Sequence, residues 1–217
     1  MLDIRNLLTV DVPEGEYGTA QVQRFEVSQE AAKFDALRGL LGSGAFRCTP
    51  AGTYTQLTVN GRLWMSDTPD ERRDHYEPVY HAYRNDSKTA LVSGLGLGMV
   101  VGALLRLDNI EAVTVVELNE DVVHLVGWHY QELAASLGKS FEVVRGDARD
   151  PAKLFPSGSY WDVAWHDIWP DLCTDNLDEM AMMSRRYARR TGWQGFWGRE
   201  LLRSQRRREQ RQMAWWS

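Results

Sequence analysis

The chain contains few cysteines, since only Cys48 and Cys173 occur among its 217 residues. Two thiols this far apart are too few for a disulfide framework or a cysteine metal cluster, and we interpret them as reduced thiols. No apolar run reaches about eighteen residues, so we expect no membrane span. The first residues, Met-Leu-Asp-Ile-Arg, lack a basic region followed by an apolar run, so we expect no secretory signal and a cytoplasmic location.

Apolar residues make up 43% of the chain, which is enough for a globular core. The net charge of −5 is unevenly spread, because residues 185–211 hold ten arginines and only Glu200 and Glu209 oppose them. That segment carries about +8 and the remainder about −13. Three interpretations of this basic tail stay open. It could follow a phosphate backbone, pair with the acidic body or a neighbouring subunit, or be a solvated helix end.

We predict that residues 1–66 form a small β-rich extension. We expect a strand over 20–27, then a helix that begins at Ser28 and runs to about Leu41, where glycines would end it. Farther on, two short strands flank Asn60-Gly61, a dipeptide that favours a tight hairpin turn because both positions tolerate a positive φ.

We predict that residues 67–171 form the main domain. An aromatic-rich helical segment comes first, and apolar strands then alternate with helices. This alternation is typical of an α/β fold of the Rossmann-like, doubly wound kind, with a mostly parallel sheet covered on both faces. The expected strands span 90–93, 112–117, 141–145 and 161–166, and the expected helices span 99–107, 119–137 and 150–154. Residues 172–217 predict a C-terminal helical tail of two helices, 174–190 and 193–211, with no further strand.

A glycine-rich turn follows the first of these strands, and it is the most informative motif. Gly94, Gly96 and Gly98 let a backbone approach other groups closely where a Cβ would clash. Glu117 ends the next strand and could accept both hydrogen bonds from a ribose diol. Asp147 and Asp167 follow the third and fourth strands. Since ligands of such sheets lie at the carboxyl ends of the strands, these residues predict one site.

These passages resemble the class I S-adenosylmethionine (SAM)-dependent methyltransferase fold, and most closely its spermidine-synthase-like branch, over roughly residues 54–171. The glycine turn matches the first SAM motif, Val-Val-Glu117 the ribose-binding strand end, Gly146-Asp147-Ala148 the adenine-binding turn, and Trp161 to Asp167 the strand that delivers an acid. The hairpin and the helix with His75 and Tyr76 are similar to the segment that carries a Tyr-His-Glu-like signature in the synthases, with the two residues in swapped order.

The resemblance implies a cofactor, SAM, and a role for each matched residue. Gly94, Gly96 and Gly98 would pass under its methionine and ribose portion, and Glu117 would hold the ribose hydroxyls. Asp147 would accept from the adenine amino group, with Ala148 as a backbone contact. Asp167 would lie beside the sulfonium and the nucleophile, where it could orient the nucleophile or take its proton. The alternative for Asp167 is that it only caps the following turn or holds the cofactor.

Several residues depart from the spermidine synthase pattern. The synthases carry an acid where this chain has Leu97, a glutamine near Ser66, and Ser-Ser-Asp-Pro where this chain has Ile168 to Asp171. Those acids bind the amines, so their loss argues against polyamine synthesis. His75 and His81 are interpreted as structural histidines, because a lone histidine is more often a satisfied structural group, and a site role is the alternative. No His, Cys or carboxylate spacing indicates a metal. Trp165 and Trp169 are interpreted as packing residues.

The sequence thus predicts a SAM-dependent transferase, in the first place a methyltransferase, whose acceptor it does not identify. Two alternatives remain. One is an aminopropyltransferase that uses decarboxylated SAM. The other is a catalytically silent SAM-fold protein that binds nucleic acid or a protein through the basic tail. We expect no membrane partner, and a homodimer stays open.

Overall fold

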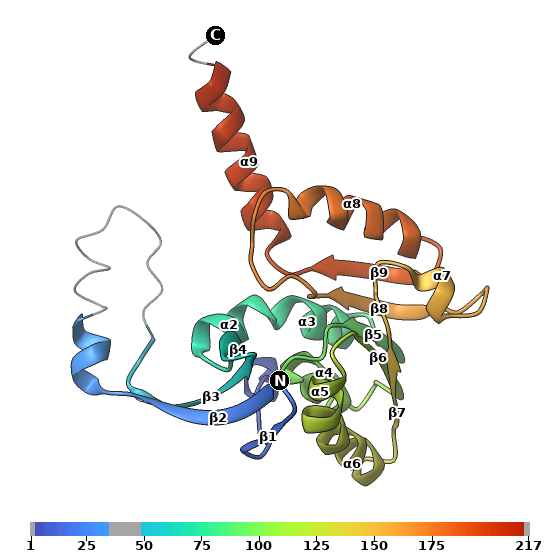
Figure 1. The fold of residues 1–217 in the computed structure, drawn as a ribbon. Coiled ribbons are helices and arrows are strands. Elements are labelled where there is room, and N and C mark those ends of the chain that lie inside the picture. Colours follow the sequence, from blue (N-terminus) through green and yellow to red (C-terminus); the bar gives the residue numbers. More distant parts are fainter. Residues whose placement is uncertain (1–2, 35–48, 215–217) are drawn as a thin grey trace.

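The computed structural model describes residues 3–34 and 49–214 and contains two sheets (Figure 1). The first is antiparallel, with β1 (Gly15–Tyr17), β2 (Ala20–Val27), β3 (Gly52–Val59) and β4 (Arg62–Ser66) in that order. Asn60 and Gly61 join β3 to β4 with φ values of 52° and 71°, which confirms the predicted tight hairpin. A short 3-10 turn, η1 (Ile4–Leu7), precedes this sheet.

The second sheet confirms the predicted Rossmann-like fold. Its five parallel strands lie in the order β7-β6-β5-β8-β9, so the chain winds outward from β5 in both directions. The strands are β5 (Thr89–Ser93), β6 (Ala112–Glu117), β7 (Ser140–Arg145), β8 (Trp161–His166) and β9 (Thr191–Phe196).

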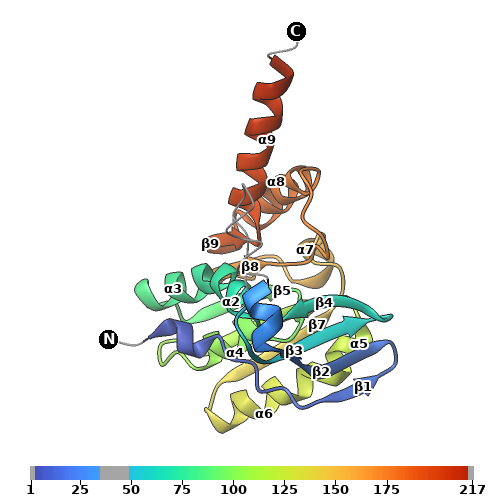
Figure 2. The same cartoon turned by 90° about the vertical axis from the view of Figure 1, so that its left-hand side faces the viewer.

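Helices cover both faces of the parallel sheet (Figures 1 and 2). One face carries α2 (Pro69–Asp74), α3 (Tyr76–Arg84), α4 (Met99–Leu105) and a continuous helical segment made of α5 (Glu120–Val122), the π-helical η2 (Val123–Gly127) and α6 (Trp128–Ser136). The other face carries α7 (Pro151–Leu154) and α8 (Asn176–Tyr187). Along β5, Ala90 and Val92 join the core on the first side while Leu91 joins the core on the second. A strand buried on both faces reads as a continuous apolar run, as β5 does.

Strand β9 corrects one prediction. We predicted no strand after Asp167 and a helix that begins at Trp193, but residues 191–196 form a strand that pairs with β8, Trp193 lying beside Val163. The four-residue spacing of Trp193 and Trp197 imitated a helical face. A Cβ at Gly195 would come within 2.7 Å of the Trp165 ring, so this glycine lets β9 lie close to the large side chains around it.

The last helix, α9 (Arg199–Ala214), therefore begins only after β9 and projects away from the body (Figures 1 and 2). The chain from 172 to 196 contributes to the sheet, and the predicted division at residues 1–66, 67–171 and 172–217 stays a prediction. Residues 29–34 are helical, and the Ser28 hydroxyl accepts from the Ala31 N–H at 3.1 Å, as a helix-capping serine does. The rest of the predicted helix, like Cys48, lies outside the described residues. None of the described helices combines the length and the apolar character that a membrane crossing requires.

Candidate functional site

A cavity of about 530 Å³ lies at the carboxyl ends of the parallel strands, under the β3–β4 hairpin. Six of the seven predicted site residues line it: Gly94, Gly96, Glu117, Asp147, Ala148 and Asp167. Further lining residues come from β4, α2 and the segment after β9, among them Met65, His75 and Trp197. Gly98 is absent from the lining, and its predicted contact with a cofactor stays a prediction.

The three glycines are required by close approaches of the protein's own groups. Gly94 has a φ of +92°, and a Cβ there would overlap the backbone oxygen of Asp167. A Cβ at Gly96 would overlap the Met65 sulfur, and one at Gly98 would overlap the Tyr130 ring. We expected the glycines to admit a ligand, and the structure shows that they also admit β8, the hairpin and α6.

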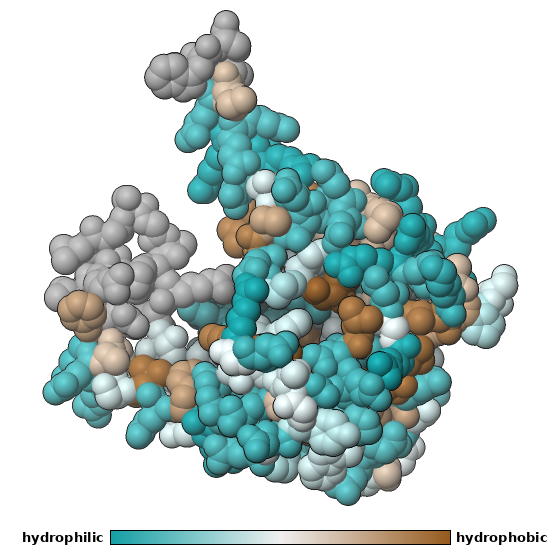
Figure 3. All heavy atoms as spheres, viewed as in Figure 1, coloured by the Kyte–Doolittle hydropathy of each residue, from teal (hydrophilic) through white to brown (hydrophobic). Residues whose placement is uncertain are grey.

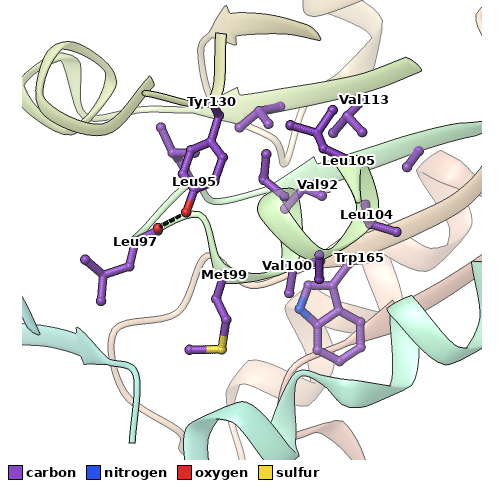
Figure 4. Close-up of a cluster of buried hydrophobic side chains, with 14 of the residues drawn as sticks. Val92, Leu95, Leu97, Met99, Val100, Leu104, Leu105, Val113, Tyr130 and Trp165 are labelled. Carbon is purple, nitrogen blue, oxygen red and sulfur yellow. Dashed lines mark hydrogen bonds between the residues drawn. The ribbon is translucent and has the colours of Figure 1, made fainter. Parts of the chain in front are cut away.

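Two side chains fasten the glycine turn from outside. The Tyr130 hydroxyl donates to the Leu97 carbonyl at 2.7 Å (Figure 4). The Met65 sulfur accepts from the Leu97 N–H at 3.0 Å. Because Met65 belongs to β4, the antiparallel sheet reaches the turn directly and forms one wall of the cavity. No motif in the sequence pointed to Met65, which sequence reasoning missed.

Glu117 braces the same turn from the end of β6. Its Oε2 accepts from the Leu95 N–H at 2.7 Å, and its Oε1 accepts from the Asn119 N–H at 2.8 Å. Burial raises the pKa of the Glu117 carboxyl, although these backbone hydrogen bonds favour the charged form, and the charge of Asp167 raises it further. A carboxylate has about four acceptor sites, and the backbone N–H groups of Leu95, Asn119 and Leu118 take up at most three of them, which leaves acceptor capacity for a ligand hydroxyl.

The turn after β7 brings Asp147 and Ala148 to the cavity. Asp147 Oδ1 accepts from the Arg149 backbone N–H at 2.9 Å and from its guanidinium at 3.3 Å. The Ala148 carbonyl accepts from the Tyr187 hydroxyl at 2.9 Å. This part of the wall is therefore held by α8, and only Oδ1 of the Asp147 carboxylate is engaged in these contacts.

Asp167 pairs with His75 at the other side of the cavity. The His75 Nε2 lies 2.8 Å from Asp167 Oδ2, and its Nδ1 lies 2.7 Å from the Glu71 carbonyl oxygen. Burial opposes the charged ring, yet the hydrogen bond and charge of Asp167, with the Glu71 carbonyl, raise the pKa of His75. Both ring nitrogens face acceptors, so the imidazolium, which donates from both, satisfies the arrangement.

The surroundings of His75 lock its position. Its ring is 3% exposed, stacks on Trp197 at 6.4 Å between centroids, and meets the Trp165 edge at 6.2 Å. Glu71 is itself fastened to β4, since its carboxylate accepts from the Ser66 N–H at 3.0 Å and from the Ser66 hydroxyl at 2.9 Å. The interpretation of His75 as merely structural missed its contact with Asp167. The Tyr-His-Glu-like signature was the available signal.

Two further histidines lie away from the cavity lining. His166 precedes Asp167 but points to the opposite face of the sheet, where its Nδ1 lies 2.9 Å from the Ser93 hydroxyl. Burial lowers the pKa of His166 to about 3, so it is neutral. His81 stacks on Trp193 at 4.4 Å, and burial lowers its pKa. Within the described residues, no group of three His, Cys, Asp or Glu side chains could hold a metal ion.

The cavity as a whole is rich in acids. Five carboxylates line it, and they face one arginine and the His75 ring. The acids are Glu71, Asp74, Glu117, Asp147 and Asp167, and the arginine is Arg149. Indole rings from Trp64, Trp165, Trp169 and Trp197 complete the wall. Acids beside aromatic faces favour a ligand that carries hydroxyls, a flat ring and positive charge.

No protein-family model matches this chain, and no curated protein matches it. Solved structures match it in part. A spermidine synthase from Thermotoga maritima matches with a TM-score of 0.44 at 15% identity, over 79% of this chain and 53% of its own. The SAH-bound methyltransferase PaMTH1 from Podospora anserina matches with a TM-score of 0.42 at 16% identity, over 56% of this chain and 50% of its own.

A spermidine synthase in complex with the transition-state analogue AdoDATO also matches, with a TM-score of 0.45 at 12% identity, over 79% of this chain and 54% of its own. The present chain therefore spans about half the length of the structures it matches. At such identities and TM-scores the likeness concerns the fold, and the chemistry has to follow from the residues of the cavity.

Proposed function

We propose that the cavity binds S-adenosylmethionine and that the protein is a SAM-dependent methyltransferase. One observation carries the proposal: four successive parallel strands each deliver a predicted residue to a single cavity. The glycine turn follows β5, Glu117 ends β6, Asp147 and Ala148 follow β7, and Asp167 follows β8. The volume of about 530 Å³ lies within the usual range of ligand pockets, about 300–1,000 Å³.

The residues present fit this cofactor. Glu117 keeps acceptor capacity for a ribose hydroxyl, and Gly94 and Gly96 line the cavity with backbone rather than side chains. The turn at Asp147 and Ala148 offers a carboxylate oxygen to an adenine amino group. The excess of acids suits a sulfonium cation, which supplies an electrophilic methyl group when it is bound.

Asp167 is the residue best placed to act on the acceptor. Its Oδ2 is occupied by His75, which leaves Oδ1 for an acceptor N–H or O–H. There it would orient the acceptor's lone pair and take the acceptor's proton as that lone pair bonds to the methyl carbon, while the carbon–sulfur bond breaks and the sulfur leaves as a neutral thioether. His75 is a positioning residue in this scheme, because it holds the carboxylate in one orientation.

Methyl transfer is preferred over aminopropyl transfer on the residues of the glycine turn and of the segment after β8. Where the synthases resembled have acids for an amine, this chain has Leu97, which is fully buried, and Pro170, which has no polar side-chain atom. Trp169, the residue before it, is buried and donates to Glu179 at 2.8 Å. The acid in this segment, Asp171, points to Arg62 at 2.5 Å. These positions offer no carboxylate for a diamine.

Calorimetry of the full chain with SAM and with decarboxylated SAM tests the proposal. We expect SAM to bind and Glu117→Ala to weaken it at least about tenfold, since the variant loses the acceptor of a ribose hydroxyl. Glu120→Ala is the matched control, because Glu120 is an exposed acid three residues on that pairs with Arg145 outside the cavity. It should stay within about twofold of the wild type.

Three outcomes would contradict the proposal. Wild-type protein that gives no heat with SAM removes the cofactor assignment. Binding of decarboxylated SAM but not of SAM would favour aminopropyl transfer. Equal loss of affinity in Glu117→Ala and Glu120→Ala would show that the ribose assignment is wrong.

A further inference from the structure

Helix α9 is unlike every other described helix, because most of its length is polar on all sides. Residues 203–212 contain no apolar side chain, and five of these ten residues are arginines. The helix projects from the body, and its surface is hydrophilic over nearly all of its described length (Figure 3). A helix that is polar on all sides has no apolar face to bury against the protein. Such a helix either contacts a partner or is simply solvated.

A groove runs between α9 and α8. It has a volume of about 490 Å³, and its α9 side is formed by four arginines and Gln210. The arginines are Arg199, Arg203, Arg206 and Arg207. Asp178 is the single acid among the lining residues. The groove is therefore strongly basic on a chain whose net charge is −5.

Within its described residues the protein pairs some of these charges but leaves the outer part of α9 unopposed, and Arg199 and Arg203 share one acid, Glu200. Arg206 pairs with Asp178 at 3.0 Å, and Arg203 pairs with Glu200 of its own helix at 2.8 Å. Within residues 3–34 and 49–214, no ion pair engages Arg207, Arg208 or Arg211. Helix α9 thus contacts the acidic remainder of the chain through the Arg206–Asp178 pair and otherwise projects away from the body (Figures 1 and 2).

We propose that α9 and the α8–α9 groove bind the phosphate backbone of a nucleic acid. All cations in residues 172–217 are arginines, whose planar fork fits phosphate oxygens with two hydrogen bonds. Protein interfaces are centred on buried aromatic or aliphatic anchors, and residues 203–212 offer none. Phosphate contacts need only donors and charge, so this surface fits a nucleic acid better than an acidic protein.

The surface is separate from the cavity but close to it in the chain. Trp197 lines the cavity, and Arg199, two residues on, lines the groove. The Arg199 guanidinium lies over the Phe196 ring at 4.8 Å, which fixes the start of α9 against the end of β9. Binding at α9 does not depend on the proposed methyl transfer, and either could fail alone.

The test is fluorescence anisotropy of the full chain with a labelled single-stranded RNA of about 20 nucleotides and a DNA duplex of about 20 base pairs, from about 50 to 300 mM salt. The triple variant Arg207→Gln, Arg208→Gln, Arg211→Gln should bind at least about tenfold more weakly at the lowest salt. Its slope of log affinity against log salt should be shallower by about 2 to 3, because three phosphate contacts are lost.

A matched control removes the same charge elsewhere. Arg5, Arg24 and Arg84 are exposed residues outside α8 and α9, and changing all three to glutamine should alter the affinity less than about twofold. Unchanged SAM binding and an unchanged circular dichroism spectrum would show that both triple variants are folded.

Other results would overturn the proposal. Absence of binding by the wild type at about 100 mM salt would do so, as would equal losses in the two triple variants, which would indicate only general charge. Competition by polyglutamate as effective as that by RNA at equal charge would assign the surface to acidic proteins. A dimer in light scattering that the α9 triple variant converts to a monomer would assign it to a second copy of this chain.

Discussion

The two sides of the cavity are built in different ways. On the glycine side, the bond to the next strand is local: Leu95 and Glu117 are 22 residues apart and belong to one strand–turn–helix–strand unit, to which Met65 and Tyr130 add contacts at Leu97. On the β8 side, Asp167 meets His75 across a separation of 92 residues. One wall is a local backbone motif, and the other is assembled from segments that only the finished fold brings together.

This difference predicts different consequences of substitution. On the glycine side, backbone conformation is the critical property, so a substitution there should damage the fold and the cofactor site together. On the β8 side, the critical groups are side chains whose charge can be removed with little change of shape. Substitutions there should alter selectivity and pH dependence while the protein stays folded.

Gly94→Ala should have the largest effect. The position has a φ of +92°, and a Cβ would overlap the Asp167 backbone oxygen, which cannot move without displacing β8. We expect the free energy of unfolding in urea to fall by about 3 kcal/mol or more. Gly138→Ala is the control, because Gly138 has a φ of +67° but no heavy atom within 4 Å of the added Cβ. It should cost about 1 kcal/mol.

If Gly94→Ala and Gly138→Ala lowered the free energy of unfolding equally, the positive φ alone would explain the loss, and the overlap with the Asp167 oxygen would contribute nothing. Gly96→Ala provides an intermediate case, because the obstacle there is the Met65 side chain. Combining it with Met65→Ala should restore part of its loss, whereas no second substitution of a side chain should rescue Gly94→Ala.

Asp167→Asn should have the next largest effect, on selectivity. If Asp167 lies beside the sulfonium, the charged cofactor should lose about tenfold in affinity while neutral S-adenosylhomocysteine stays within about twofold. Calorimetry with both ligands measures the ratio. Glu117→Ala, from the glycine side, should weaken both ligands alike because the ribose is common to them. A loss of the same size for both ligands in Asp167→Asn would place the residue away from the charge.

Most of the glycine side could be predicted from the sequence, because all of its residues except Met65 and Tyr130 are marked by their position in a repeating pattern. Valine-rich strands followed by glycine or an acid placed Gly94, Glu117 and Asp147 at one edge of the sheet before any contact was known. Strands β5, β6 and β8 began and ended within about one residue of the expected positions for the same reason.

The β8 side could be predicted only in part. Asp167 followed from its strand, but its partner His75 lies on a different element, and no local pattern records a contact so distant in sequence. Strand β9 was missed because its two glycines and Trp193 carry no strand pattern of their own. Its place is decided by the β8 edge, which would otherwise leave backbone groups unpaired.

The pH dependence of stability should report the pairing of His75 with Asp167. The folded-state pKa of His75 is raised above its ordinary value of 6.5, so the pair contributes fully below pH 6.5, and its contribution is lost as the pH rises through the raised value. We therefore expect the stability difference between wild type and Asp167→Asn to shrink between about pH 6 and pH 9. A difference that is constant over this range would show that His75 is not charged in the folded protein.

The smallest effect is expected where the hairpin meets the β8 side at the surface. Arg62 and Asp171 lie 2.5 Å apart, but their side chains are 60% and 68% exposed, and water and salt screen such a pair. A double-mutant cycle with Arg62→Gln and Asp171→Asn should give a coupling energy of about 0.5 kcal/mol or less, falling further in high salt. Coupling above about 1 kcal/mol that persists in salt would mean that this pair holds the hairpin over the cavity. In that case the β8 side would depend on an exposed ion pair as well as on buried groups from distant parts of the chain.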